Sequence, residues 1–166
     1  MLTLRSVAFI FLLMITAACA VRPQIPEASA RSQPAVQFWA VSVADAALIA
    51  DWYEKHFGFR TVEQTTLSGG ARTRVLQSDF AILELVEVPE AKALSEIAPQ
   101  MGRRFLVHGV FKVGIFVTDL ESTVQRLRES GVTFRGGIIN DTNLKVRTIL
   151  AIDPEGNTVQ LFERVP

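Results

Sequence analysis

Residues 41–45 are Val-Ser-Val-Ala-Asp and residues 115–119 are Ile-Phe-Val-Thr-Asp, so two similar stretches lie 74 residues apart. Each leads from an apolar, β-branched run into a helical pattern that ends at a glycine. Residues 83–87 (Leu-Glu-Leu-Val-Glu) are echoed by residues 159–163 (Val-Gln-Leu-Phe-Glu), at an offset of 76. A repeat of this kind builds one fold from two similar halves. We therefore expect a functional site between the halves, formed from equivalent positions.

Composition limits the classes of protein to which the chain can belong. The 166 residues, of which 49% are apolar and 20% charged, suffice for one domain with a hydrophobic core but not for two ordinary ones. The 17 lysines and arginines balance the 17 aspartates and glutamates. Nucleic-acid-binding domains normally carry a basic excess, so no nucleic-acid partner is expected.

The N-terminus has the pattern of an export signal. Residues 7–18 are apolar except for Thr16, and this run is too short to span a membrane, which takes about 20 residues. Residues 1–19 therefore predict a signal peptide. Its last residue, Cys19, occupies the position that the lipidated cysteine has in a bacterial lipobox, and it is the candidate lipidation site. The alternative is ordinary cleavage at Ala18-Cys19-Ala20, which would remove the cysteine.

The predicted location follows from this signal. The protein is expected to be exported to the cell envelope as a membrane-anchored lipoprotein, or otherwise to be periplasmic or secreted. Membrane contact would then occur only through the N-terminal lipid.

The rest of the chain divides into a tether, two modules and a connector. Residues 20–35 contain three prolines and no apolar periodicity, which predicts a flexible linker. Residues 36–88 and 110–166 each show a strand, a helix and three further strands, joined by a connector over 89–109. The predicted class is α+β, with two βαβββ modules forming paired curved sheets around one cleft.

Local signals mark the helix ends in both modules. Asp45 is a suitable N-cap for the first helix, and Thr118 with Glu121 matches a capping box for the second. Gly58 and Gly131 end the two helices.

The two histidines are not assigned to a site. His56 lies at the end of the first helix, where positive charge is favourable, and we interpret it as a surface residue. His108 lies in the connector and is interpreted as an exposed loop residue.

Several motifs together carry a family resemblance. Residues 151–161, Ala-Ile-Asp-Pro-Glu-Gly-Asn-Thr-Val-Gln-Leu, resemble the closing hairpin of the vicinal oxygen chelate superfamily. Val43-x-Asp45 and Val117-x-Asp119 match the starts of its two helices. This superfamily includes glyoxalases, extradiol dioxygenases, fosfomycin-inactivating thiol transferases and bleomycin-resistance proteins. The resemblance covers about residues 36–163 and implies the duplicated βαβββ fold.

The resemblance also implies four positions where active members bind a metal, usually through His, Glu or Gln, His and Glu. In this chain they fall on Phe38, Glu84, Lys112 and Gln160. Phenylalanine cannot bind a metal, and an ammonium group is a poor ligand compared with imidazole. The family's metal chemistry is therefore not expected here, and no cofactor or catalytic residue is assigned.

The same positions suggest a ligand cleft instead. Strand alternation predicts that Lys112 and Glu84 face the cleft, where they either pair with each other or contact a ligand. Aromatic walls with a few polar groups are typical of small-molecule pockets. The candidate ligand-binding residues are Phe38, Ser42, Glu84, Lys112, Phe116, Arg147 and Gln160.

Three hypotheses on function remain open. The first is an exported glyoxalase- or bleomycin-resistance-like domain that lacks the usual metal ligands and binds a small molecule in its cleft. The second is a divergent lyase- or transferase-like enzyme that uses Lys112 and Glu84. The third is a scaffold or interaction module of the envelope. A homodimer stays open, because dimers are common in the family.

Overall fold

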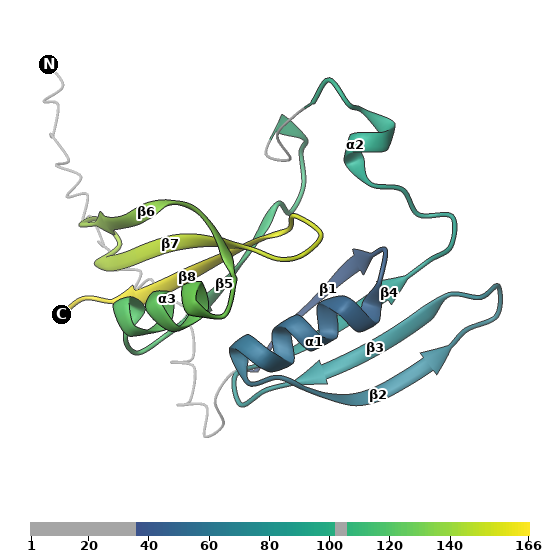
Figure 1. Ribbon diagram of the computed structural model, residues 1–166, viewed down its shortest axis with the longest axis horizontal. Coiled ribbons are helices and arrows are strands. Elements are labelled where there is room, and N and C mark those ends of the chain that lie inside the picture. The colour runs from purple at the N-terminus through teal and green to yellow at the C-terminus, as the bar shows by residue number, and fades with distance from the viewer. Residues whose placement is uncertain (1–35, 102–105) are drawn as a thin grey trace, which may run out of the picture. The chain divides into compact units, whose positions relative to one another are not determined.

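The structure is a computed structural model that describes residues 36–101 and 106–166 (Figure 1). The predicted signal peptide, the linker and Cys19 lie outside the described residues. Within the described part of the chain, no helix has the length and hydropathy needed to cross a membrane.

The first module is a four-stranded sheet with one helix. Its elements are β1 (Gln37–Val43), α1 (Ala46–Phe57), β2 (Arg60–Thr66), β3 (Arg72–Gln77) and β4 (Ala81–Glu87). The strands lie in the order β1-β4-β3-β2. β1 is parallel to β4, and the other neighbours are antiparallel.

The second module repeats this arrangement. Its elements are β5 (Lys112–Phe116), α3 (Leu120–Glu129), β6 (Thr133–Asp141), β7 (Val146–Ile152) and β8 (Thr158–Arg164), with strand order β5-β8-β7-β6. Only β5 and β8 are parallel. A short helix, α2 (Leu94–Ile97), lies between the modules. The predicted pair of βαβββ modules is confirmed.

Carboxylates begin both long helices. Asp45 Oδ1 accepts hydrogen bonds from two amides of the first turn of α1, at 2.9 and 3.0 Å. Asp119 Oδ1 accepts the Ser122 amide of α3 at 2.9 Å, and the Ser122 hydroxyl donates to its other oxygen at 2.6 Å. The predicted capping box at Thr118 is therefore wrong, because Asp119 is the N-cap. These hydrogen bonds from Ser122 lower the pKa of Asp119.

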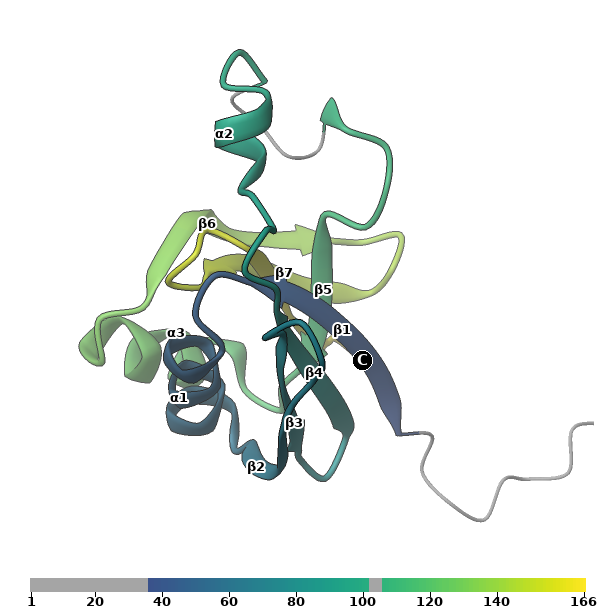
Figure 2. The same ribbon diagram turned by 90° about the vertical axis from the view of Figure 1, so that its right-hand side faces the viewer.

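One hydrophobic core is shared by the two modules. Alternate residues of β4 and β8 are fully buried in it, namely Ala81, Leu83, Leu85, Val159 and Leu161. The helices α1 and α3 lie beside each other on one side of the strands (Figure 2). The largest fully buried side chains from both modules are Tyr53, Ile49, Leu76, Leu83, Leu85, Leu120, Leu127, Ile149 and Leu161.

Contacts outside the core also join the modules, although the described strands form two separate sheets. The main such contact is made by Glu155, which lies in the turn between β7 and β8. Its two carboxylate oxygens each lie 2.9 Å from the amide nitrogen of Ala44, and one lies 2.8 Å from that of Asp45. The Arg126 guanidinium of α3 also donates to the carbonyl oxygen of His56, at 3.4 Å. The second module thereby holds both ends of α1.

Candidate ligand-binding cleft

A groove of about 410 Å³ lies between β1 and β5. Each of these strands is paired on one edge only, β1 with β4 and β5 with β8. The volume is within the usual range for small-molecule pockets, about 300–1,000 Å³. We call this the inter-strand groove. Its lining residues are Phe38, Trp39, Ala40, Val41, Ser42, Tyr53, Val110, Phe111, Lys112, Val113, Asn157 and Thr158.

Three of the candidate residues meet in this groove, namely Phe38, Ser42 and Lys112. Phe38 is 63% exposed, so its ring is available to a ligand. The Lys112 ammonium lies 5.3 Å from the centroid of the Phe111 ring, which is within cation–π range. The groove therefore combines exposed aromatic surface with a positive charge.

The floor of the groove includes aromatic residues that the sequence analysis missed. Trp39 and Tyr53 line it from the core side. The Trp39 Nε1 atom is enclosed, and Trp39 interacts with the Tyr53 side chain. Burial, and then the negative charge of Asp153, raise the pKa of Tyr53, which therefore stays protonated. Alternation alone assigns Trp39 to the core, so no local signal placed it beside the groove.

Glu84 and Gln160 occupy equivalent positions in the two modules. Glu84 lies opposite Ala40 of β1, and Gln160 lies opposite Gly114 of β5. Glu84 is partly buried, and its carboxylate makes no hydrogen bond or ion pair with any residue that the structure describes. Gln160 Nε2 donates to Thr148 Oγ1 at 2.8 Å, while its Oε1 is enclosed without a described partner.

The ion pair considered for Lys112 and Glu84 does not form. The described ion pairs join Arg72 to Glu87 and Arg147 to two glutamates. Glu84 lies on β4, so β1 stands between it and the inter-strand groove that Lys112 lines. The Lys112 ammonium instead lies over an aromatic ring.

Arg147 lies away from the groove. Its guanidinium is paired with Glu121 of α3 and, at 3.2 Å, with Glu163 of β8. Arg147 and Glu163 are also opposite each other in the register of β7 and β8, on the face that carries Leu161 toward the helices. The structure therefore places this candidate in an ion-pair cluster on the helix side of the sheet.

Phe116 lies on the open face of the second sheet, outside the residues that line the groove. Its ring stacks on Phe162 with centroids 5.2 Å apart, and the Arg164 guanidinium lies 4.9 Å from its centroid. Neighbouring Gly114 has no room for a side chain, because an added Cβ would lie 2.9 Å from the Phe162 ring. This aromatic pair is therefore tightly fitted to the β5 backbone.

His56 is not the surface residue that the sequence predicted. It is only 6% exposed, because Ser130 and Arg126 of the second module contact the end of α1. Burial, followed by the charges of Lys55 and Arg126, lowers the pKa of His56. His108 is exposed, as expected of a connector residue.

The four family positions do not fit a metal ion. Phe38 offers no donor atom and Lys112 brings a positive charge, which leaves one carboxylate and one amide. Across the described ranges, no group of three or more histidine, cysteine, aspartate or glutamate side chains could hold a metal. No metal-dependent step can therefore be built on these residues.

Residues 35–161 match the family model of the Glyoxalase/Bleomycin resistance protein/Dioxygenase superfamily. The chain belongs to this superfamily. No curated protein matches it.

Several solved structures share the fold of this chain. A glyoxalase family protein from Enterococcus faecalis is 15% identical, with a TM-score of 0.65 over 77% of this chain and 96% of that one. A glyoxalase family protein from Bacillus cereus is 17% identical, with a TM-score of 0.62 over 84% of this chain and 100% of that one. TioX from a Micromonospora strain is 18% identical, with a TM-score of 0.57 over 78% and 98%. At these identities the likeness concerns the fold alone.

Proposed function

We propose that this superfamily member binds a small aromatic or amphipathic anion, such as an aromatic carboxylate, in the inter-strand groove. One observation carries the proposal: the Lys112 ammonium lies beside exposed aromatic rings and is not neutralised by any described carboxylate. Such a site attracts an anionic group while its walls receive an apolar body. The protein would then act by binding rather than by metal chemistry.

Each groove residue has a role in this proposal. The Lys112 ammonium pairs with the carboxylate of the ligand, and the Ser42 hydroxyl is available to donate a hydrogen bond. The exposed Phe38 ring lies against the apolar part of the ligand. Glu84, which lies behind β1, disfavours a second negative charge near the groove.

Titration calorimetry with benzoate and indole-3-acetate tests the proposal. Replacing Lys112 with Met should weaken binding about ten- to hundredfold, because a hydrogen bond to a charged group contributes about 1.5–3 kcal/mol. Lys145→Met is the matched control, since Lys145 lies in the turn between β6 and β7, outside the groove. No binding of either compound, or equal affinities for Lys112→Met and the unmodified protein, would refute the proposal.

A catalytic alternative has one observation in its favour. Glu84 is a partly buried carboxylate without a described ion-pair partner, so it is available as a base in a lyase- or transferase-like step. Glu84→Gln distinguishes the two functions. A variant that still binds the ligand but no longer converts it would favour the enzyme, whereas an absence of conversion by the unmodified protein favours binding.

We also propose that the protein reaches the cell envelope through a lipid on Cys19. Support comes from the sequence pattern of residues 1–19 alone. Metabolic labelling with a radioactive fatty acid should mark the unmodified protein and leave Cys19→Ser unlabelled. Equal labelling of the two would remove the anchor from the proposal.

A further inference from the structure

The free edge of β1 borders the inter-strand groove. Residues 38–42 of β1 line the groove consecutively, and so do residues 110–113 at and before the start of β5, whereas no residue of β4 does. Since β4 pairs with β1 along its other edge, the groove runs beside the edge of β1 that no described strand covers. An extended chain, which pairs through its backbone, can therefore approach β1 from the groove.

Backbone hydrogen-bonding groups of β1 point to this free edge. The N–H and C=O of one strand residue point to the same edge, and those of the next residue point to the opposite edge. The Gln37 amide donates to the Phe80 carbonyl oxygen, on the β4 side, at 3.1 Å. The backbone groups of Phe38, Ala40 and Ser42 therefore point away from β4, where no described hydrogen bond engages them. They repeat about every 6.6 Å, which is the two-residue repeat of another extended chain.

The β1 edge lacks the features that protect the other sheet edges. The outer strands β2 and β6 carry register irregularities, which follow Thr61 and Arg135, and β5 begins with Lys112. In contrast, β1 pairs with β4 without a register shift, and residues 37–43 include no proline and no charged side chain. Bulges, prolines and charges are the usual means of keeping a sheet edge from pairing with another chain. The β1 edge is therefore regular and open to such pairing.

The opposite wall of the groove carries a positive charge. Lys112, which lines the groove from β5, forms no ion pair with a described carboxylate. A second copy of β1 has no acidic side chain and would leave Lys112 unpaired. A chain with a free carboxylate fits the groove better, because that group pairs with the ammonium. Phe38, which is 63% exposed, and Val110, which is 84% exposed, favour apolar side chains on the bound chain.

We propose that the inter-strand groove binds a short, extended peptide with apolar side chains, which adds to the free edge of β1 through backbone hydrogen bonds and places its C-terminal carboxylate at Lys112. The proposal rests on the proposed function for the anionic group, whereas the backbone pairing is independent of it. The edge from Phe38 to Ser42 is about 13 Å long, so a tetrapeptide covers it. Strand addition of this kind gains affinity from main-chain hydrogen bonds.

Calorimetry on the full chain with acetyl-Thr-Val-Tyr-Val, which ends in a free carboxylate, tests the pairing. We expect this peptide to bind at least tenfold more tightly than benzoate, because benzoate has no backbone groups to pair. Methylating one peptide nitrogen at a time should weaken binding about three- to tenfold at alternate positions only, since alternate amides face β1. No binding of the peptide, an affinity no higher than that of benzoate, or N-methylated peptides that all bind alike would overturn the proposal.

Proline substitutions test the edge from the side of the protein. Ala40→Pro removes a donor at the free edge without removing a hydrogen bond to β4, and it should weaken peptide binding about tenfold. Ala93→Pro is the matched control, since Ala93 is exposed, has φ = −65°, which suits proline, and lies outside the groove. Equal affinities of the two variants would contradict strand addition. If Ala40→Pro does not fold, the N-methylated peptides still decide.

Two further outcomes separate this proposal from its alternatives. The peptide with a C-terminal amide and the Lys112→Met variant report on the carboxylate alone. If neither change weakens binding while the alternating effect of N-methylation persists, the charge contact of the proposed function is refuted and strand addition stands. If benzoate binds but the N-methylated peptides all bind alike, the reverse holds. A dimer in analytical ultracentrifugation that Ala40→Pro dissociates, together with no peptide binding, would assign the edge to a second copy and overturn the proposal.

Discussion

Replacing Glu155 with Ala tests how strongly the second module supports the first. The Glu155 carboxylate accepts two backbone amides just before α1, at 2.8 and 2.9 Å, from a position 110 residues away in the chain. Removing it leaves these amides to water and removes a negative charge from the N-terminal end of a helix.

The size of the effect follows from these contacts. A hydrogen bond to a charged group contributes about 1.5–3 kcal/mol, and an exposed site lies at or below the lower end of that range. A charge near a helix terminus adds about 0.3–1 kcal/mol. For two amides, we expect Glu155→Ala to lower the free energy of unfolding by about 2 kcal/mol. Glu155→Gln should lower it by about 1 kcal/mol, because the amide keeps one acceptor oxygen but loses the charge.

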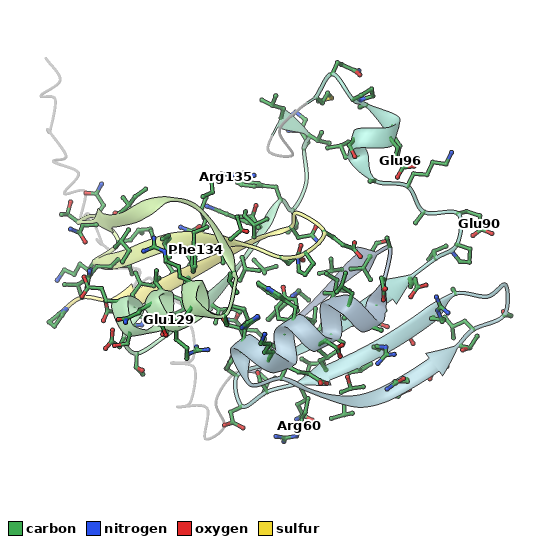
Figure 3. All side chains as sticks on the ribbon, in the orientation of Figure 1. Arg60, Glu90, Glu96, Glu129, Phe134 and Arg135 are labelled. Atoms are coloured by element: carbon green, nitrogen blue, oxygen red, sulfur yellow. The ribbon has the colours of Figure 1, made fainter. Side chains whose placement is uncertain are left out.

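Urea unfolding monitored by circular dichroism measures both variants. Glu90→Ala is the control, since Glu90 is exposed and points away from both modules (Figure 3). Glu90→Ala should lower the free energy of unfolding by no more than about 0.5 kcal/mol. If Glu155→Ala and Glu90→Ala unfold at the same urea concentration, the contact does not stabilise the fold and the reasoning fails.

Two further outcomes follow from the structure. Gly114→Ala should lower the free energy of unfolding by about 1–3 kcal/mol, because the added Cβ would lie 2.9 Å from the Phe162 ring. Gly137→Ala is the control, since its Cβ would meet no atom within 4 Å and thermal unfolding should be nearly unchanged. Stability should also fall as the pH drops below about 6.5. The pKa of His56 is lower in the folded state, so the unfolded chain takes up the proton first. In urea unfolding experiments between about pH 5 and 7.5, His56→Gln should reduce the dependence of the free energy of unfolding on pH. The same pH dependence in the variant and the unmodified protein would contradict a lowered pKa of His56 in the folded state.

The fold was predictable because its signals are local and occur twice. Gly58 ends α1 with φ = 69°, a left-handed conformation that suits glycine and that the sequence pattern anticipated. In β4, Leu83 and Leu85 are fully buried on one face while Glu84 lies on the other, as alternation requires. Each of these features depends only on neighbours in the chain.

The site was less predictable because it depends on how the modules dock. His56 is buried by α3, whose contacts lie about 70 residues further along the chain, and no periodic pattern reports such contacts. The position of the Arg147 guanidinium is set by its ion pairs with Glu121 of α3 and Glu163 of β8. The partner of Lys112 proved to be an aromatic ring of its neighbour rather than Glu84.

The turns that precede the last strand of each module differ in length. Residues 78–80 join β3 to β4, and there Ser78 bonds only within its own turn. Residues 153–157 join β7 to β8, and the longer turn carries Glu155 to the start of α1. The support from these turns is one-sided: Glu155 of the later module holds the start of α1, whereas Ser78 of the earlier module makes no described hydrogen bond with the second module. The two halves are therefore not interchangeable: replacing residues 153–157 with a copy of the shorter turn would remove this support.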